Sequence, residues 1–140
     1  MKKLFVFVFC LLSLNTFAQK VEKDLKYYYY YLNQDKDFMA YLDAKRAFEK
    51  NKSDFKLPSS PEALKEIEAH ESKILKNDKT YAEFLTKYGM QNAGEYAELW
   101  YNQMQTLKTF IKKNPEFYKL TPKERQNIID KWYYSETVKN

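Results

Sequence analysis

Apolar residues recur at helical spacing along most of the chain, and glycines and prolines separate the apolar segments. The only glycines are Gly89 and Gly94, and the four prolines lie between the apolar stretches rather than inside them. This pattern is typical of helices joined by short turns, because a sheet protein needs many more turn residues. The sequence therefore predicts an all-α protein.

The first predicted helix covers residues 21–51. Its apolar side chains recur three or four residues apart, at Leu25, Tyr28, Leu32, Met39 and Leu42. The polar residues 33–37 interrupt this stripe, and the apolar phase then resumes through Phe38, Tyr41 and Phe48. We expect the interruption to bend or split the helix.

The second and third predicted helices each begin at a capping signal. After a connector over residues 53–60, Ser60-Pro61-Glu62 supplies a cap, a proline at the first helical position and an acidic first turn. The expected inward face of this helix consists of Leu64, Ile67, Ile74 and Leu75. Thr80-Tyr-Ala-Glu83 resembles a capping box and starts a third helix, which ends before Gly89.

The fourth predicted helix starts at Asn92 and has the longest apolar stripe. This stripe comprises Tyr96, Leu99, Trp100, Gln103, Met104, Leu107, Phe110 and Ile111. We expect Trp100 to be largely buried, in one core with Leu99, Leu107 and Ile111. An extra turn over residues 114–120 leads to the last helix, which begins at Thr121-Pro122-Lys123-Glu124 and faces inward through Ile128, Ile129 and Trp132. The prediction is a small bundle of about five helices.

Residues 1–18 have the pattern of a cleavable signal peptide. Lys2 and Lys3 precede an apolar core over residues 4–14, and Thr16-Phe17-Ala18 places small residues at the positions that signal peptidase reads. As a helix this core rises only ~16 Å, about half of a ~30 Å hydrocarbon layer, so cleavage is favoured over a membrane anchor. We predict a single all-helical domain over residues 19–140, exported to the periplasm or the extracellular space, with no membrane span after cleavage.

Cleavage changes the charge and the cysteine content. Loss of Lys2 and Lys3 lowers the formal net charge from +5 to +3, with acidic and basic residues interspersed, which argues against a nucleic-acid partner. Cys10 is the only cysteine and leaves with the signal peptide. The mature chain then has no disulfide and no thiol nucleophile, and its stability depends on packing alone.

The sequence offers little for catalysis or metal binding. His70 is the only histidine, and neither a Gly-x-Ser-x-Gly elbow nor a phosphate-binding loop accompanies it. Glu66 and His70 lie four residues apart on one helical face, with Glu71 beside them, whereas a structural metal site usually needs four ligands. We therefore predict no metal and no cofactor. The alternative that stays open is a small envelope hydrolase centred on Glu66 and His70.

Aromatic residues are the most conspicuous feature of the predicted mature chain. The full sequence contains 13 tyrosines and two tryptophans, and these include the candidate binding residues Tyr27, Tyr28, Tyr29, Tyr30, Tyr31, Trp132, Tyr133 and Tyr134. Five successive side chains spread around a whole helix, so some of the tyrosine run must lie outside the core. Tyrosine combines a rigid apolar face with a polar tip, which suits recognition of proteins and peptides.

These features predict an exported, non-enzymatic helical binding module of the bacterial cell envelope, with an unidentified protein or peptide as its partner. The alternative explanation of the tyrosines is compositional, since lysine, asparagine and phenylalanine are frequent as well. A pocket converging on His70 would favour the hydrolase, and an open aromatic groove near residues 27–31 would favour the binding module. The sequence predicts neither the oligomeric state nor the identity of the partner.

Overall fold

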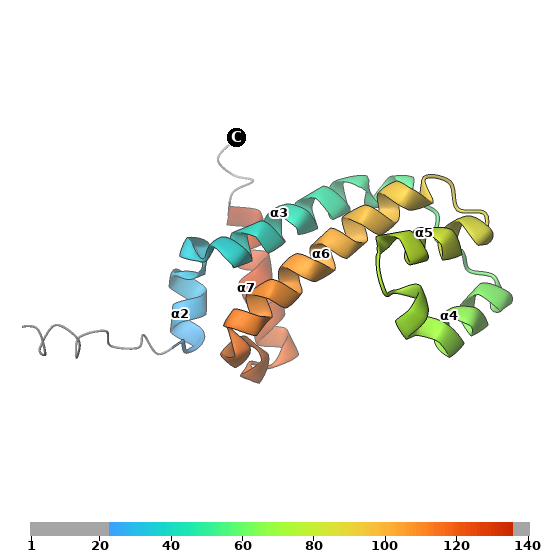
Figure 1. Cartoon of the computed structure of the whole chain (residues 1–140). Helices are drawn as coiled ribbons and strands as arrows, with labels where there is room; N and C mark the ends of the chain where they lie inside the picture. The colour runs from blue at the N-terminus through green and yellow to red at the C-terminus, as the bar shows by residue number, and fades with distance from the viewer. Residues whose placement is uncertain (1–22, 136–140) are drawn as a thin grey trace, which may run out of the picture.

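The computed structural model describes residues 23–135, and within this range it contains six α-helices, three short 3-10 helices and no strand (Figure 1). The all-α prediction is confirmed. None of the helices in the described range is long and apolar enough to cross a membrane. The predicted signal peptide and the predicted mature N-terminus at Gln19 lie outside the described residues.

The helix predicted over residues 21–51 is divided as the polar interruption suggested. It consists of α2 (Leu25–Tyr30), the 3-10 turn η1 (Leu32–Gln34) and α3 (Lys36–Asn51). Asp35 lies at the division, where its carboxylate accepts hydrogen bonds from the backbone N–H groups of Asp37 and Phe38 at 2.9 and 3.1 Å. These bonds satisfy donors that the first turn of α3 would otherwise leave unpaired.

The next two helices begin at capping residues. The 3-10 turn η2 (Lys52–Asp54) leads to α4 (Pro61–Ile74), where the Ser60 hydroxyl accepts from the N–H of Ala63 at 3.2 Å, as predicted. In α5 (Asp78–Lys87) the predicted start at Thr80 is wrong. Asn77 is the cap: its side chain accepts from the Thr80 N–H, and the Thr80 hydroxyl accepts from the Asn77 N–H. Thr80 therefore lies inside the first turn of α5.

The last part of the described chain follows the prediction closely. It consists of α6 (Ala93–Lys113), the 3-10 turn η3 (Pro115–Lys119) and α7 (Pro122–Ser135). The expected capping box before α7 is present, since Glu124 accepts from the Thr121 N–H at 2.8 Å and the Thr121 hydroxyl accepts from the Glu124 N–H at 3.3 Å. The extra turn predicted between the last two helices is η3.

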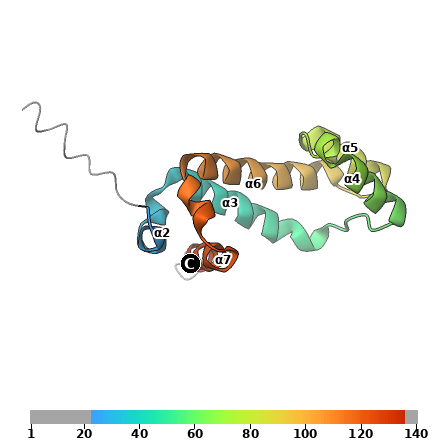
Figure 2. The same ribbon diagram turned by 90° about the horizontal axis from the view of Figure 1, so that it is seen from below.

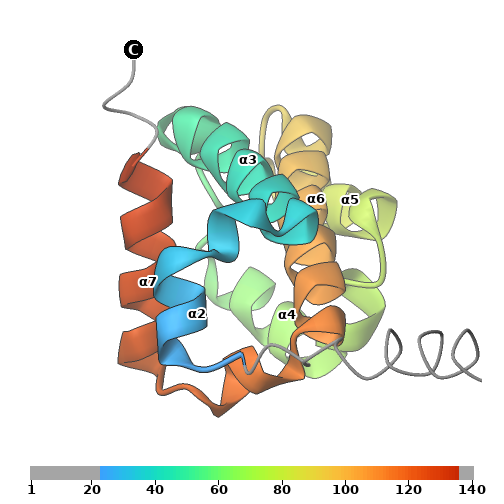
Figure 3. The same ribbon diagram turned by 90° about the vertical axis from the view of Figure 1, so that its left-hand side faces the viewer.

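The helices form an elongated arrangement around one long pair. α3 and α6 lie side by side along most of their length, with α4 and α5 at one end and α2 and α7 at the other (Figures 1 and 2). Figure 3 looks onto the second end, where α2 and α7 lie next to each other in front of the α3–α6 pair. Both ends therefore depend on the same two helices.

Two hydrophobic clusters fill this arrangement. The first cluster, which we call the α5 core, includes Phe48, Tyr81 and Tyr96. The second cluster, which we call the α7 core, includes Phe38 and Phe110. Fully buried members of the α7 core include Tyr28, Leu32, Leu42, Phe117 and Ile128.

The stripe on α6 supplies both cores, so the expectation of one shared core is wrong. Leu99 and Trp100 pack against the α5 core, whereas Leu107 and Ile111 pack against the α7 core. Met104 lies between them and is 41% exposed. Trp100 is half-buried at the edge of its core rather than enclosed by it.

Two other residues expected on inward stripes lie largely at the surface. Leu25 is 38% exposed and Leu64 is 51% exposed. In α4 the buried residues are Ala63 and Ile74, so this helix turns a narrow face toward the rest of the protein. Periodicity alone predicted a wider one.

Candidate functional site

α7 lies against the C-terminal end of α2 and brings the two predicted aromatic segments together (Figure 3). The indole N–H of Trp132 donates to the backbone carbonyl of Tyr28 at 3.0 Å, and the Lys131 ammonium donates to the carbonyl of Tyr29. We call the joined set, residues 27, 29–31 and 132–134, the aromatic surface.

The Lys131 ammonium connects rings from both segments. It lies 5.0 Å from the ring centroids of Tyr29 and Tyr30, and 4.6 Å from that of Trp132. A cation within about 6 Å of an aromatic centroid is attracted by the ring quadrupole. One lysine therefore helps to hold three aromatic side chains at fixed positions.

The five tyrosines of the run have different environments, as their angular spacing required. Tyr28 is fully buried in the α7 core, whereas Tyr30 and Tyr31 are 65% and 54% exposed. Tyr27 and Tyr29 are half-buried, and the Tyr27 and Tyr31 rings lie 6.2 Å apart. Of the predicted binding residues, Tyr28 is therefore a packing residue whose side chain is closed off from the surface.

The Tyr28 hydroxyl is a buried polar group without a hydrogen-bond partner among the described residues. Its ring packs edge-on against Phe117, with centroids 5.2 Å apart. Burial, followed by the negative charge of Glu116, raises the pKa of Tyr28 to about 12. This hydroxyl therefore stays protonated near neutral pH.

The C-terminal aromatic segment extends toward α3. The guanidinium group of Arg46 donates to the carbonyls of Trp132 and Tyr133 at 3.2 Å each, near the end of α7. Lys45 and Arg46 also lie over the Tyr133 ring, at 5.5 and 5.6 Å from its centroid. Tyr134 is 61% exposed next to it. Cationic side chains thus border the aromatic surface on α3 and α7.

Sequence reasoning missed Lys131, Lys45 and Arg46 as parts of this site. Lys131 directly precedes Trp132, but successive residues on a helix point about 100° apart, so their adjacency predicts no contact. The contact exists because the end of α2 lies beside both side chains.

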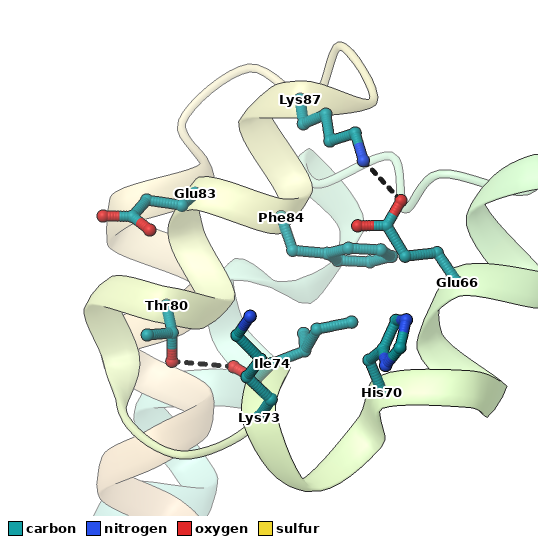
Figure 4. A pocket seen from close by; sticks show the side chains of 8 residues that line it. All are labelled: Glu66, His70, Lys73, Ile74, Thr80, Glu83, Phe84 and Lys87. Carbon is teal, nitrogen blue, oxygen red and sulfur yellow. Dashed lines mark hydrogen bonds and ion pairs between the residues drawn. The ribbon is translucent and has the colours of Figure 1, made fainter.

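The Glu66 and His70 side chains line a separate hollow of about 270 Å³ between α4 and α5 (Figure 4). Ile74 and Phe84 supply apolar surface to it. His70 has non-helical backbone angles, φ −133° and ψ 25°, which kink α4 at this point. The helix thus changes direction beside the hollow.

The Glu66 carboxylate is already engaged. It accepts hydrogen bonds from the Lys87 ammonium and the Tyr88 hydroxyl, both at 2.5 Å, and no hydrogen bond joins it to His70 in the described structure. The bond from Lys87, and then that from Tyr88, lowers the pKa of Glu66. A carboxyl group that acts as a general acid near neutral pH needs the opposite shift.

Within residues 23–135, no three histidine, cysteine or acidic side chains lie close enough together to hold a metal ion. Comparison with known proteins gives no further guide: no protein family matches the chain, and no curated protein or solved structure is significantly similar to it.

Proposed function

We propose that this protein is an exported, non-enzymatic helical binding module of the bacterial cell envelope, which contacts a protein or peptide through the aromatic surface. The observation that carries the proposal is the position of Lys131 over the rings of Tyr29, Tyr30 and Trp132. Because Lys131 contacts rings from both segments, it joins two parts of the chain about a hundred residues apart into one surface.

The chemistry of the exposed residues supports a protein or peptide ligand. Tyrosine and tryptophan bring large, rigid, amphipathic contact area and are enriched in protein interfaces. Tyr30, Tyr31 and Tyr134 are each more than half exposed. Lys45, Arg46 and Lys131 also place positive charge beside these rings, which favours carboxylate groups of a partner.

The test replaces Tyr30 and Tyr31 by serine together. Because both side chains are exposed, we expect a melting curve like that of the wild type and reduced binding to a peptide array and to envelope proteins. Leu64→Ser is the matched control, since Leu64 is 51% exposed but lies in α4, away from the aromatic surface. Equal binding by the double variant and the wild type would remove the main support for the proposal.

Export is the second part of the proposal. The charged start, apolar core and small-residue junction of residues 1–18 support cleavage before Gln19. N-terminal sequencing and intact mass of the protein from its native host should show a chain that begins at Gln19, either free or cyclised to pyroglutamate. Recovery of the chain with Met1 in the membrane fraction would contradict export by cleavage.

The alternative function is a small envelope hydrolase centred on Glu66 and His70. The observation that favours it is the hollow that both residues line. A panel of ester, peptide and glycan substrates tests it, with His70→Ala as the comparison. We expect no hydrolysis by either protein, and turnover that depends on His70 would favour the hydrolase instead.

A further inference from the structure

An apolar groove runs along α6 on the side where Met104 is exposed. It consists of two adjoining hollows, of about 340 and 270 Å³, that share Leu107, Ile111 and Tyr118. We call it the α6 groove. In Figure 2, α4 and α5 lie at one end of α6 and α7 lies at the other, so the groove spans the part of α6 between the two ends of the molecule.

The groove has the length and the residue types of a helix-binding site. Its α6 wall is formed by Trp100, Met104, Leu107 and Ile111, which follow one face of the helix and rise about 16 Å over three turns. Tyr118 lines both hollows and is 56% exposed. Tryptophan, methionine and tyrosine are enriched at protein interfaces, and amphipathic helices bind in grooves of this kind.

The charge of the groove indicates which helix it suits. No aspartate or glutamate lines either hollow, whereas Lys108 and Arg125 do. Lys108 has no hydrogen bond or ion pair within the described residues, so its charge is available to a ligand. Arg125 donates to the carbonyls of Tyr118 and Leu120 at 2.9 Å each and keeps its positive charge at the groove. Acidic groups on a partner would therefore be favoured.

We propose that the α6 groove binds an amphipathic helix of another protein, with acidic residues flanking the apolar face of that helix. A second copy of this chain fits less well, because a two-fold contact through the groove would bring Lys108 and Arg125 toward their own equivalents. The groove uses residues other than those of the aromatic surface. Binding at the α6 groove can therefore be tested separately from binding at the aromatic surface.

The binding test uses the protein purified from cells that express the full-length chain. The probe is a fluorescein-labelled helical peptide of about 18 residues, long enough for five turns, with leucines along one face and glutamates on its flanks. Fluorescence anisotropy should show saturable binding. A matched peptide with lysine in place of glutamate should bind at least about tenfold more weakly. No binding, or equal binding of the two peptides, would overturn the proposal.

Two variants locate the contact. Met104→Ala removes an exposed apolar side chain and Lys108→Glu reverses the free charge, and each should weaken peptide binding about fivefold or more. Lys65→Glu, at an exposed position of α4, is the matched charge control and should leave binding unchanged. If the control loses binding, or if both variants bind the peptide as tightly as the wild type, the groove is not the site.

The tryptophan indole N–H signals in NMR spectra distinguish the groove from the aromatic surface. The chain has two tryptophans, Trp100 in the groove and Trp132 in the aromatic surface. On peptide binding the Trp100 signal should shift and the Trp132 signal should stay. A shift of Trp132 alone would place the peptide on the aromatic surface and overturn the inference. Self-association that excludes the peptide, or binding of anionic vesicles without any preference for the acidic peptide, would also overturn it.

Discussion

The indole nitrogen of Trp132 and the carbonyl oxygen of Tyr28 are 3.0 Å apart and join the last helix of the described chain to the first. The carbonyls in the last turn of a helix have no partner within it, and α2 has only six residues. Through Trp132 and Lys131, α7 pairs two carbonyls of α2. The position of the tyrosine run therefore depends on a helix about a hundred residues further along the chain.

Trp132→Phe tests this link. The phenyl ring keeps part of the packing but has no N–H donor, so we expect the free energy of unfolding to fall by about 1 kcal/mol or somewhat more. Urea titration followed by circular dichroism measures the change. A variant as stable as the wild type would show that the indole hydrogen bond contributes nothing to the fold.

The buried hydroxyl of Tyr28 leads to the opposite expectation for a similar substitution. Tyr28→Phe removes a hydroxyl group that has no hydrogen-bond partner in the described structure. The free energy of unfolding of this variant should therefore equal that of the wild type or exceed it by up to about 1 kcal/mol. Tyr28→Ala, which leaves a cavity, should lose about 3–5 kcal/mol. Thermal and denaturant unfolding of both variants are the measurements, and a marked loss in Tyr28→Phe would mean that the hydroxyl has a stabilising partner.

Trp100 and Phe110 allow the two cores to be compared on one helix. Trp100 is half-buried and packs edge-on against Tyr81, with centroids 4.9 Å apart, whereas Phe110 is fully buried. We expect Trp100→Ala to lower the free energy of unfolding by about 2–3 kcal/mol and Phe110→Ala to lower it by about 3–5 kcal/mol. Denaturant titration should rank the variants in this order. The reverse order would mean that the α6 groove side of Trp100 is covered in solution.

The Glu66 carboxyl predicts a pH dependence. Its pKa is lowered in the folded protein, mainly by the hydrogen bond from Lys87, from an ordinary value of 4.5. A lowered carboxyl pKa stabilises the folded state above the ordinary value, and this contribution disappears as the pH falls through the folded pKa. The stability difference between wild type and Glu66→Gln should therefore be constant between about pH 6 and about pH 9, where Lys87 and Tyr88 keep their protons, and should shrink below pH 4.5. Denaturant titrations of both proteins across this range test it, and a difference independent of pH would contradict it.

The starts of several helices were predictable because capping is local. Ser60-Pro61 and Thr121-Pro122 place their acceptors and prolines within one turn of the helix they begin, so short sequence patterns determine α4 and α7. At α5 the same reasoning chose Thr80, although Asn77 is the better cap and uses Thr80 as its partner. Two candidates three residues apart resemble a capping signal, and the reciprocal hydrogen bonds between Asn77 and Thr80 decide in favour of Asn77.

Packing partners were not predictable from periodicity. The α6 stripe is continuous in sequence, but α5 covers one part, the α7 core covers the other, and Met104 is left exposed between them. The same limit applies to the aromatic surface. Angular spacing correctly required some tyrosines to be exposed, but it could not select Tyr28 as the fully buried one, because that depends on where Phe117 and α7 lie.

The separation of the two cores by Met104 has a consequence for how the molecule opens. Each end has its own apolar contacts, so local opening of α4 and α5 need not break the contacts of α2 and α7. Amide hydrogens should therefore exchange in two groups with different protection, one for each end, while the central turns of α3 and α6 exchange most slowly. A ligand that contacts both ends at once would couple their opening, so that the amide hydrogens of both ends exchange with the same protection.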